Sequence, residues 1–328
     1  MSRKKTNAGK NGFVVVVVLC MVVMLGVLLL GFDYECRTRL RVAENSSKCQ
    51  RALLCAKAGL NIAIAAVAND SVCGNSKLLN LLSGKTAIGI DAGTCSVKIS
   101  EENGKLNLNR LIDESGNIDW TKTDQLLRLV DVLNQSRNDQ VVIDCDLTPS
   151  LIDWMDIDEG VTVLAFATCE NFGAESGYYE KLDPAYSCRN GQLETAEELL
   201  LIKGVSAEVF NRIRDYVTVY GDGKININSA PSEIIECLSK KIDSCLAQMI
   251  VDRRQIRAYS SVGQLRTAAP MTDSIFDELS SVITVTPTER YYRVTSVGHA
   301  GGHSHNVEAI LKRGTKTEEV EVILYREN

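Results

Sequence analysis

The sequence predicts an α+β protein that begins with a long transmembrane helix and continues into an antiparallel sheet and a large helical region. Three observations indicate this fold class. Residues 13–32 form an uncharged apolar run, the middle of the chain carries helical periodicity, and alternating apolar residues close the chain. Helices and strands that occupy separate stretches of sequence are typical of α+β folds. The chain has 328 residues, enough for two domains.

The apolar run is long enough to cross a membrane. A helix over residues 13–32 is about 30 Å long, which is the thickness of the hydrocarbon core of a bilayer. Four basic residues precede the run, and Asp33 and Glu35 follow it. The positive-inside rule therefore places the N-terminus in the cytoplasm and the main domain outside it. A cleaved secretory signal is the alternative, but the run exceeds a normal h-region and no small-x-small site precedes Asp33.

The junction between Gly12 and Phe13 carries a second signal. A short basic leader that ends in Gly, directly before an aromatic residue and a long apolar helix, resembles a type IV prepilin or pseudopilin signal. The resemblance implies that a prepilin peptidase cleaves between Gly12 and Phe13 and methylates Phe13. Most pilins carry Glu at the fifth mature position, but Val17 stands here, as in the K-type minor pseudopilins of type II secretion systems. An ordinary single-span anchor is the alternative interpretation.

Helix and strand patterns follow the apolar run. Residues 37–68 lack Pro and are rich in Ala, which predicts that the helix continues. Its Ala stripe suits packing either on its own domain or on other subunits. Alternating apolar residues over 95–99 and 106–108, joined by Asn103-Gly104, predict a β-hairpin. Similar alternation predicts three closing antiparallel strands, over 291–297, 306–311 and 319–324.

The middle of the chain closely resembles the type II secretion protein K family. The resemblance rests on four motifs in the family's order: DWMDIDE (153–159), GAESGYYEKLDPAY (173–186), ELLLIKG (198–204) and VYGDGKININSAP (219–231). It implies a pilin-like α/β domain with an antiparallel sheet, interrupted by an inserted all-α domain with helix-hairpin-helix (SAM-like) repeats. The expected boundaries are a leader at 1–12, a transmembrane helix at 13–32, a first pilin-like part at 33–112, the insert at 113–285 and a second pilin-like part at 286–328.

Carboxylates gather in the first two of these motifs. Asp153, Asp156, Asp158 and Glu175 can aim several oxygens at one point, and calcium takes six to eight oxygen ligands. The family resemblance also implies calcium in the inserted domain, although an apolar spacer separates Asp158 from Glu175. Helix capping and solvated surface charge are the alternatives. Paired-carboxylate hydrolysis lacks any accompanying substrate motif, so we expect no enzymatic activity.

Two segments, 200–213 and 227–256, have the pattern of helical hairpins, which in other proteins grip phosphates through helix N-termini. Charge argues against nucleic acid here. The chain has 36 Lys plus Arg against 42 Asp plus Glu, a net charge of -6. Residues 193–283 carry 10 basic and 13 acidic residues, a net charge of -3, whereas affinity for a phosphate backbone depends on accumulated positive charge. We therefore expect no binding of nucleic acid, and the family resemblance implies that these hairpins act as a protein scaffold.

The eleven cysteines and three histidines have no pattern typical of a catalytic or zinc site. Outside the cytoplasm the cysteines are expected to form disulfides. Cys237 and Cys245 flank a predicted helix turn, and a bridge there would contribute about 2 to 3 kcal/mol; the other pairings stay open. His299, His303 and His305 have no Cys or acid between them, which favours a solvated hairpin over zinc.

The resemblance implies a minor pseudopilin that helps to initiate and cap the pseudopilus tip of a type II secretion system. Its expected partners are the I and J minor pseudopilins, other pseudopilus subunits and the prepilin peptidase. Its expected location is the bacterial inner membrane, with the main domain in the periplasm. Two alternatives are a membrane-tethered DNA-uptake receptor that uses the helical hairpins, and an anchored calcium-dependent binding module.

Overall fold

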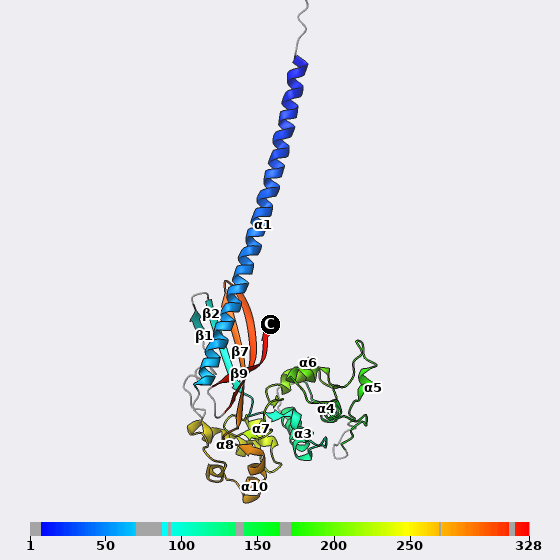
Figure 1. The fold of residues 1–328 in the computed structure, drawn as a ribbon, viewed down its shortest axis with the longest axis vertical. Coiled ribbons are helices and arrows are strands. Elements are labelled where there is room, and N and C mark those ends of the chain that lie inside the picture. The colour runs from blue at the N-terminus through cyan, green and yellow to red at the C-terminus, as the bar shows by residue number, and fades with distance from the viewer. Residues whose placement is uncertain are drawn as a thin grey trace, which may run out of the picture.

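The computed structural model describes residues 8–69, 87–90, 93–135, 141–164, 172–268, 270–314 and 319–327. Figure 1 shows three parts along the long axis of the molecule: a helical stem, a sheet against the lower end of that stem, and a helical region at the end farthest from the start of the stem. Strands of the main sheet and helices of the helical region thus occupy separate parts, which agrees with the predicted mixture of helix and antiparallel sheet.

The stem is one continuous helix, α1 (Ala8–Ala68). This confirms the prediction that the helix extends past the apolar run. The apolar part of α1 is long and apolar enough to cross a membrane, and none of its residues is buried among the residues that the structure describes. The lower part packs on the sheet through buried residues that recur every one or two turns, among them Ala52, Ala56, Ala63 and Ala66. Small side chains on this face allow α1 to lie close to the strands.

The main sheet has five antiparallel strands in the order β1-β2-β7-β8-β9. Helix α1 covers one face of it and contacts β2, β7 and β8. The three predicted closing strands are confirmed, and each is longer than its predicted core. The strands are β1 (Ala87–Ile90), β2 (Gly93–Glu101), β7 (Glu289–Ala300), β8 (His303–Gly314) and β9 (Val320–Glu327).

The predicted hairpin at Asn103-Gly104 is wrong. Strand β2 pairs with β1 and β7, and the residues after the turn form β3 (Leu106–Asn107), which pairs in parallel with β4 (Val217–Thr218). The reason is a long-range contact: the Asn103 side chain accepts from the Tyr291 amide at 2.8 Å and donates to the Glu289 carbonyl at 2.9 Å. These bonds hold the turn on β7 and direct the chain away from the sheet.

Residues between β2 and β7 build a second, larger core. It includes Leu106, Leu108 and Leu111, which the predicted boundary at residue 112 assigned to the first pilin-like part. The other elements of this helical region are η1 (Leu108–Arg110), α3 (Trp120–Gln135), α4 (Leu147–Met155), α5 (Ser176–Tyr179), η2 (Ala196–Leu201), α6 (Ala207–Ile213), β5 (Ile225–Asn226), α7 (Ser232–Cys237), α8 (Ser244–Ile256), η3 (Val262–Gln264), α9 (Leu265–Ala268), α10 (Asp273–Val282) and β6 (Ile283–Thr284), where η marks a 3-10 helix and β5 pairs in parallel with β6.

Helical elements occupy both segments that were predicted to form helical hairpins. In the first, η2 and α6 flank Gly204, whose positive φ of 83° suits a tight turn. Its first element is a 3-10 helix, which is tighter and shorter than the α-helix expected there. In the second, α7 and α8 follow one another across a short turn.

Polar and aromatic contacts join the sheet to the helical region. The Asn226 side chain donates to a carboxylate oxygen of Glu101 on β2 at 2.8 Å. The rings of Tyr220 and Tyr291 stack with their centroids 5.7 Å apart. The helical region is therefore held against the end of the sheet by specific contacts in addition to the covalent connections.

Candidate functional site

Three of the predicted acidic residues lie together at the C-terminal end of α4. Asp153 is in the last turn of α4, Asp156 follows its end, and Glu175 immediately precedes α5. One carboxylate oxygen from each lies within 4.8 Å of the others. Asp153 is fully buried and Glu175 is 6% exposed, so the fold holds these acids in its interior although acids normally lie at the surface.

These acids have too few hydrogen-bond donors around them. Asp153 accepts from the Thr162 amide through Oδ1 at 2.9 Å. Its Oδ2, Oδ1 of Asp156 and both carboxylate oxygens of Glu175 are buried and lack a hydrogen-bond partner among the described residues. Buried polar atoms without partners are costly, so this group of oxygens is suited to a cation.

The raised pKa values of the clustered carboxyl groups also favour a bound cation. Burial, followed by the charges of Asp153 and Asp158, raises the pKa of Asp156 to about 7. Burial, followed by the charges of Asp153 and Asp156, likewise raises the pKa of Glu175 to about 7. Burial also raises the pKa of Asp153. The ionised forms repel one another in a poorly solvated place, and a bound cation would relieve that repulsion.

Asp158, the fourth predicted ligand, lies outside this group. Its side chain is exposed, and its Oδ1 accepts from the Gly160 amide at 2.7 Å in a local turn. Asp158 is therefore better described as a solvated turn residue than as a member of the cluster.

Asn190 is a nearby residue that the sequence interpretation missed. Its Oδ1 is buried without a partner among the described residues, and its backbone amide donates to the Trp154 carbonyl at 3.0 Å. It lines a cavity of about 480 Å³ together with Asp156 and Asp158. The available signal was the Asn190-Gly191 dipeptide, because Asn tolerates the positive φ of 50° found here.

The donor chemistry of the cluster suits calcium better than zinc. Carboxylate and amide oxygens are the ligands that calcium takes, whereas structural zinc takes thiolate and imidazole. A neighbouring thiol, that of Cys188, donates to the Ala174 carbonyl at 3.6 Å, and burial raises its pKa to about 12. Cys188 therefore stays protonated and leaves a set of hard oxygen ligands.

The predicted disulfide between Cys237 and Cys245 is not formed. Both thiols are free, and they occupy different environments. Cys237 is fully buried in α7, where its Sγ donates to the Ile234 carbonyl at 3.1 Å, while Cys245 is exposed in the first turn of α8. Cys145 is in a disulfide, which the sequence spacing did not predict.

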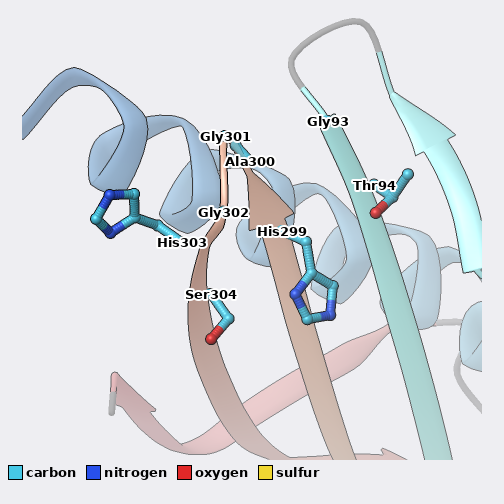
Figure 2. Close-up of a pocket in the computed structure, with 8 residues that line it drawn as sticks. All are labelled: Gly93, Thr94, His299, Ala300, Gly301, Gly302, His303 and Ser304. Carbon is cyan, nitrogen blue, oxygen red and sulfur yellow. The ribbon is translucent and has the colours of Figure 1, made fainter. Parts of the chain in front are cut away.

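The three histidines lie at the hairpin between β7 and β8. The register pairs His299 with Ser304 and His303 with Ala300, which places the two imidazoles on opposite faces of the hairpin. Figure 2 shows the two rings directed away from each other, beside a cavity of about 330 Å³ lined by the turn glycines Gly301 and Gly302. These two rings therefore cannot bind one metal ion together.

The predicted cleavage site lies near the start of the stem. Gly12 and Phe13 are both within α1, and the Phe13 side chain is 72% exposed. Cleavage and methylation at this bond stay predictions.

Comparison with known families and proteins identifies the family of the chain. Residues 104–222 and 225–286 match two family models, both described as type II secretion system (T2SS), protein K. Together these ranges cover more than half of the chain.

Two curated relatives carry the same description. The type II secretion system protein K of Pseudomonas aeruginosa is 24% identical over 316 residues, which are 93% of this chain and 90% of that relative. The protein of the same description from Aeromonas hydrophila is 25% identical over 174 residues, and the match spans 51% of this chain and half the length of that relative.

A solved structure has the same fold. It is the crystal structure of the GspK-GspI-GspJ complex from the type 2 secretion system of enterotoxigenic Escherichia coli, with a TM-score of 0.67 and 18% identity, covering 88% of this chain and 99% of the other. The family models, the relatives and the fold agree with the resemblance carried by the four motifs. The chain belongs to the type II secretion system protein K family, and its role is that of a minor pseudopilin.

Proposed function

We propose that this chain helps to initiate and cap the pseudopilus tip of a type II secretion system. The observation that carries the proposal is the arrangement of the two ends of the molecule. The apolar part of the stem is not buried by any other part of the described chain, and the helical region lies at the opposite end, beyond the sheet. The stem is thus available to other subunits, while the helical region would obstruct a subunit that arrived above it.

Val17 supports a position at the start of the polymer. An acid in mid-bilayer is costly without a partner, and the Glu that most pilins carry at this place is thought to pair with the terminal amine of a neighbouring subunit. A subunit with Val17 has no such charge to neutralise and needs no preceding subunit. We infer that it joins the polymer first.

The partners we propose are minor pseudopilins of the I and J types. The structural neighbour is a complex of GspK with GspI and GspJ. The exposed upper part of α1 and its sheet-packed lower end have the shape expected of a subunit that bundles with other helices. We also propose that the residues between β2 and β7 are an inserted domain with helix-hairpin-helix repeats, and that it acts as a protein scaffold in the periplasm.

Processing precedes assembly in this proposal. A prepilin peptidase would cleave after Gly12 on the cytoplasmic face of the inner membrane and methylate Phe13. Mass analysis of the N-terminus of the protein purified from membranes should find a chain that begins with N-methylated Phe13. Retention of residues 1–12 would contradict this step and favour a simple anchored binding module.

Calcium binding by the carboxylate cluster is a separate part of the proposal. Asp153, Asp156 and Glu175 would hold the ion, and the unpartnered oxygens described above support it. The ion would fix the end of α4 against the start of α5. It would thereby stabilise the helical region without taking part in any chemical reaction.

Assembly order can be tested at Val17. The substitution Val17→Glu should leave the folded domain unchanged but allow the subunit to enter the polymer below another subunit. Val16→Glu is the matched control, since it places the same charge one residue away from the expected pairing position. Cross-linking to I- and J-type subunits in membranes would report the order, and tip incorporation of Val17→Glu identical to that of the parent would count against the proposal.

A further inference from the structure

Two arginines at the C-terminal end of α8 line a small cavity. Arg253 is in the last turn of α8 and Arg257 caps it one turn later. Both side chains are exposed. With Tyr259, Gln264 and Thr267 they line a cavity of about 150 Å³, between the end of α8 and the segment η3–α9. We call this cavity the α8 arginine pocket.

The two guanidinium groups have no partner among the described residues, whereas neighbouring arginines do. Arg254, which lies between them in sequence, donates to the carbonyls of Ile227 and Ala230. Arg266 pairs with Asp273 and Asp277. Arg254 and Arg266 thus have structural partners, whereas the side chains of Arg253 and Arg257 make no salt bridge or hydrogen bond with the part of the chain that the structure describes.

The other polar side chains that line the pocket already donate hydrogen bonds within the chain, so the two guanidinium groups are its main hydrogen-bond donors. The Tyr259 hydroxyl donates to the Ile250 carbonyl at 3.1 Å, and the Thr267 hydroxyl donates to the Gln264 carbonyl at 3.0 Å. The Gln264 amide donates to the Ser260 hydroxyl at 2.8 Å. The hydroxyl hydrogens of Tyr259 and Thr267 and one amide hydrogen of Gln264 are already used within the chain. The two guanidinium groups therefore supply most of the free donors, and they favour an acceptor group as the ligand. Guanidinium groups bind carboxylates and phosphates through paired hydrogen bonds.

Two apolar residues share the face of α8 that carries Arg253. Met249, Arg253 and Ile256 are spaced as i, i+4 and i+7, so they form one stripe along the helix. Ile256 is 80% exposed and Met249 is 40% exposed. The surface therefore offers an apolar contact directly beside two unpaired positive charges.

We propose that the α8 arginine pocket binds an acidic side chain of a partner protein, presented by a segment that also carries apolar residues. The cavity is smaller than sites for small-molecule ligands, which are about 300 Å³ or more, and this size suits a single side chain. The surrounding residues 193–283 have a net charge of -3, which disfavours the extended phosphate backbone of a nucleic acid. Partner recognition through this pocket is independent of calcium and of the order of assembly.

The proposal can be tested with the full-length chain in lipid nanodiscs. The probe is the peptide acetyl-Ala-Leu-Glu-Leu-Ala-amide, and its matched control replaces Glu with Gln. Calorimetric titration should detect binding of the Glu peptide, and the Gln peptide should bind about fivefold more weakly. The double variant Arg253→Gln/Arg257→Gln should lose binding to a similar extent, while Lys181→Gln, at an exposed lysine outside the pocket, should bind like the parent.

A charge-conserving variant separates recognition from folding. Arg253→Lys/Arg257→Lys keeps the positive charge but removes the planar forks, so it should retain the melting temperature and bind the Glu peptide more weakly than the parent. Equal binding of the Glu and Gln peptides, or equal loss in Lys181→Gln, would overturn the proposal. Arginine-dependent binding of a duplex DNA or of inorganic phosphate without binding of the Glu peptide would also overturn it, since the site would then recognise phosphate.

Discussion

Arg293 on β7 contacts the fully buried Glu102 that follows β2, with 3.2 Å between Nε and Oε1. Lys105 reaches the same carboxylate oxygen at 2.5 Å, and Arg293 also contacts Glu308 on β8 at 2.8 Å. Through Glu197 of η2, at 3.6 Å from Arg293, the network extends into the helical region. One guanidinium therefore links the sheet to the helical region.

The first prediction is that Arg293→Gln destabilises the protein strongly. The substitution removes one of the two cations from a buried carboxylate, and loss of one partner of a buried ion pair costs about 3 to 5 kcal/mol. Thermal unfolding should show a large drop in melting temperature. The control is Arg39→Gln, which breaks an exposed pair with Glu35 on the stem and should change the melting temperature little. Similar small effects of both variants would show that the network is dispensable.

The second prediction concerns acid stability. Burial alone would raise the pKa of Glu102, but Lys105 and Arg293 outweigh it and hold the pKa below its ordinary value of 4.5. A lowered folded-state pKa contributes stability above the unfolded-state value, and this contribution is lost as pH falls through the folded-state value. The melting temperature should therefore decline as pH falls below about 4.5. Glu102→Gln should be less stable at pH 7 and should show a weaker decline.

A long-range contact to the same strand, β7, explains why one sequence prediction failed. The closing strands and the stem follow from local patterns, because each strand pairs with its neighbour in sequence and the stem is a single helix. The sequence around Asn103-Gly104 has the local signal of a hairpin turn. The Asn103 side chain, however, bonds to β7, nearly 190 residues away. Local turn chemistry cannot reveal a partner that is so distant in sequence.

The carboxylate cluster shows the same limit at a finer scale. Asp156 and Asp158 have equivalent positions in the motif, and spacing alone could not tell which one joins Asp153. The end of α4 decides it, because Asp156 stays partly buried at the C-cap while Asp158 lies in the exposed turn that follows. Asn190 was missed because its place in the cavity depends on the fold of a later segment.

The third prediction is a calcium-dependent gain in stability. If the cluster binds calcium, an ion concentration of about 100 times Kd should stabilise the fold by about 2.7 kcal/mol. Glu175→Gln should abolish most of this gain, because Glu175 supplies two unpartnered oxygens. The matched control is Asp158→Asn, which lies outside the group and should retain the gain. Thermal unfolding with calcium and with a chelator measures the gain in stability of each variant. If only Asp158→Asn lost the gain, the calcium site would have to be assigned to different residues.

The fourth prediction is the pH dependence of this cluster, which is opposite in sign to that of Glu102. With a chelator present, the raised pKa values of about 7 for Asp156 and Glu175 mean that the cluster's contribution to stability is lost as pH rises from about 4.5 through 7. Calcium requires the ionised carboxylates, so the calcium-dependent gain should grow over the same rise in pH. Glu175→Gln should flatten the chelator profile. A gain from calcium that is independent of pH would contradict binding at these carboxylates.

The fifth prediction tests how closely the stem packs on the sheet. A Cβ at Gly298 on β7 would lie 2.0 Å from the Ala52 carbonyl oxygen of α1, so Gly298→Ala should force the helix away and cost about 2 kcal/mol or more. Gly89→Ala on β1 is the control, because a Cβ there meets nothing within 4 Å. Peptide mapping after thiol labelling gives a second readout, since displacement of α1 should expose Cys55, which lies on the face of α1 that is buried against the sheet. An unchanged melting temperature with Cys55 still protected would mean that α1 and the sheet pack less tightly than this contact requires.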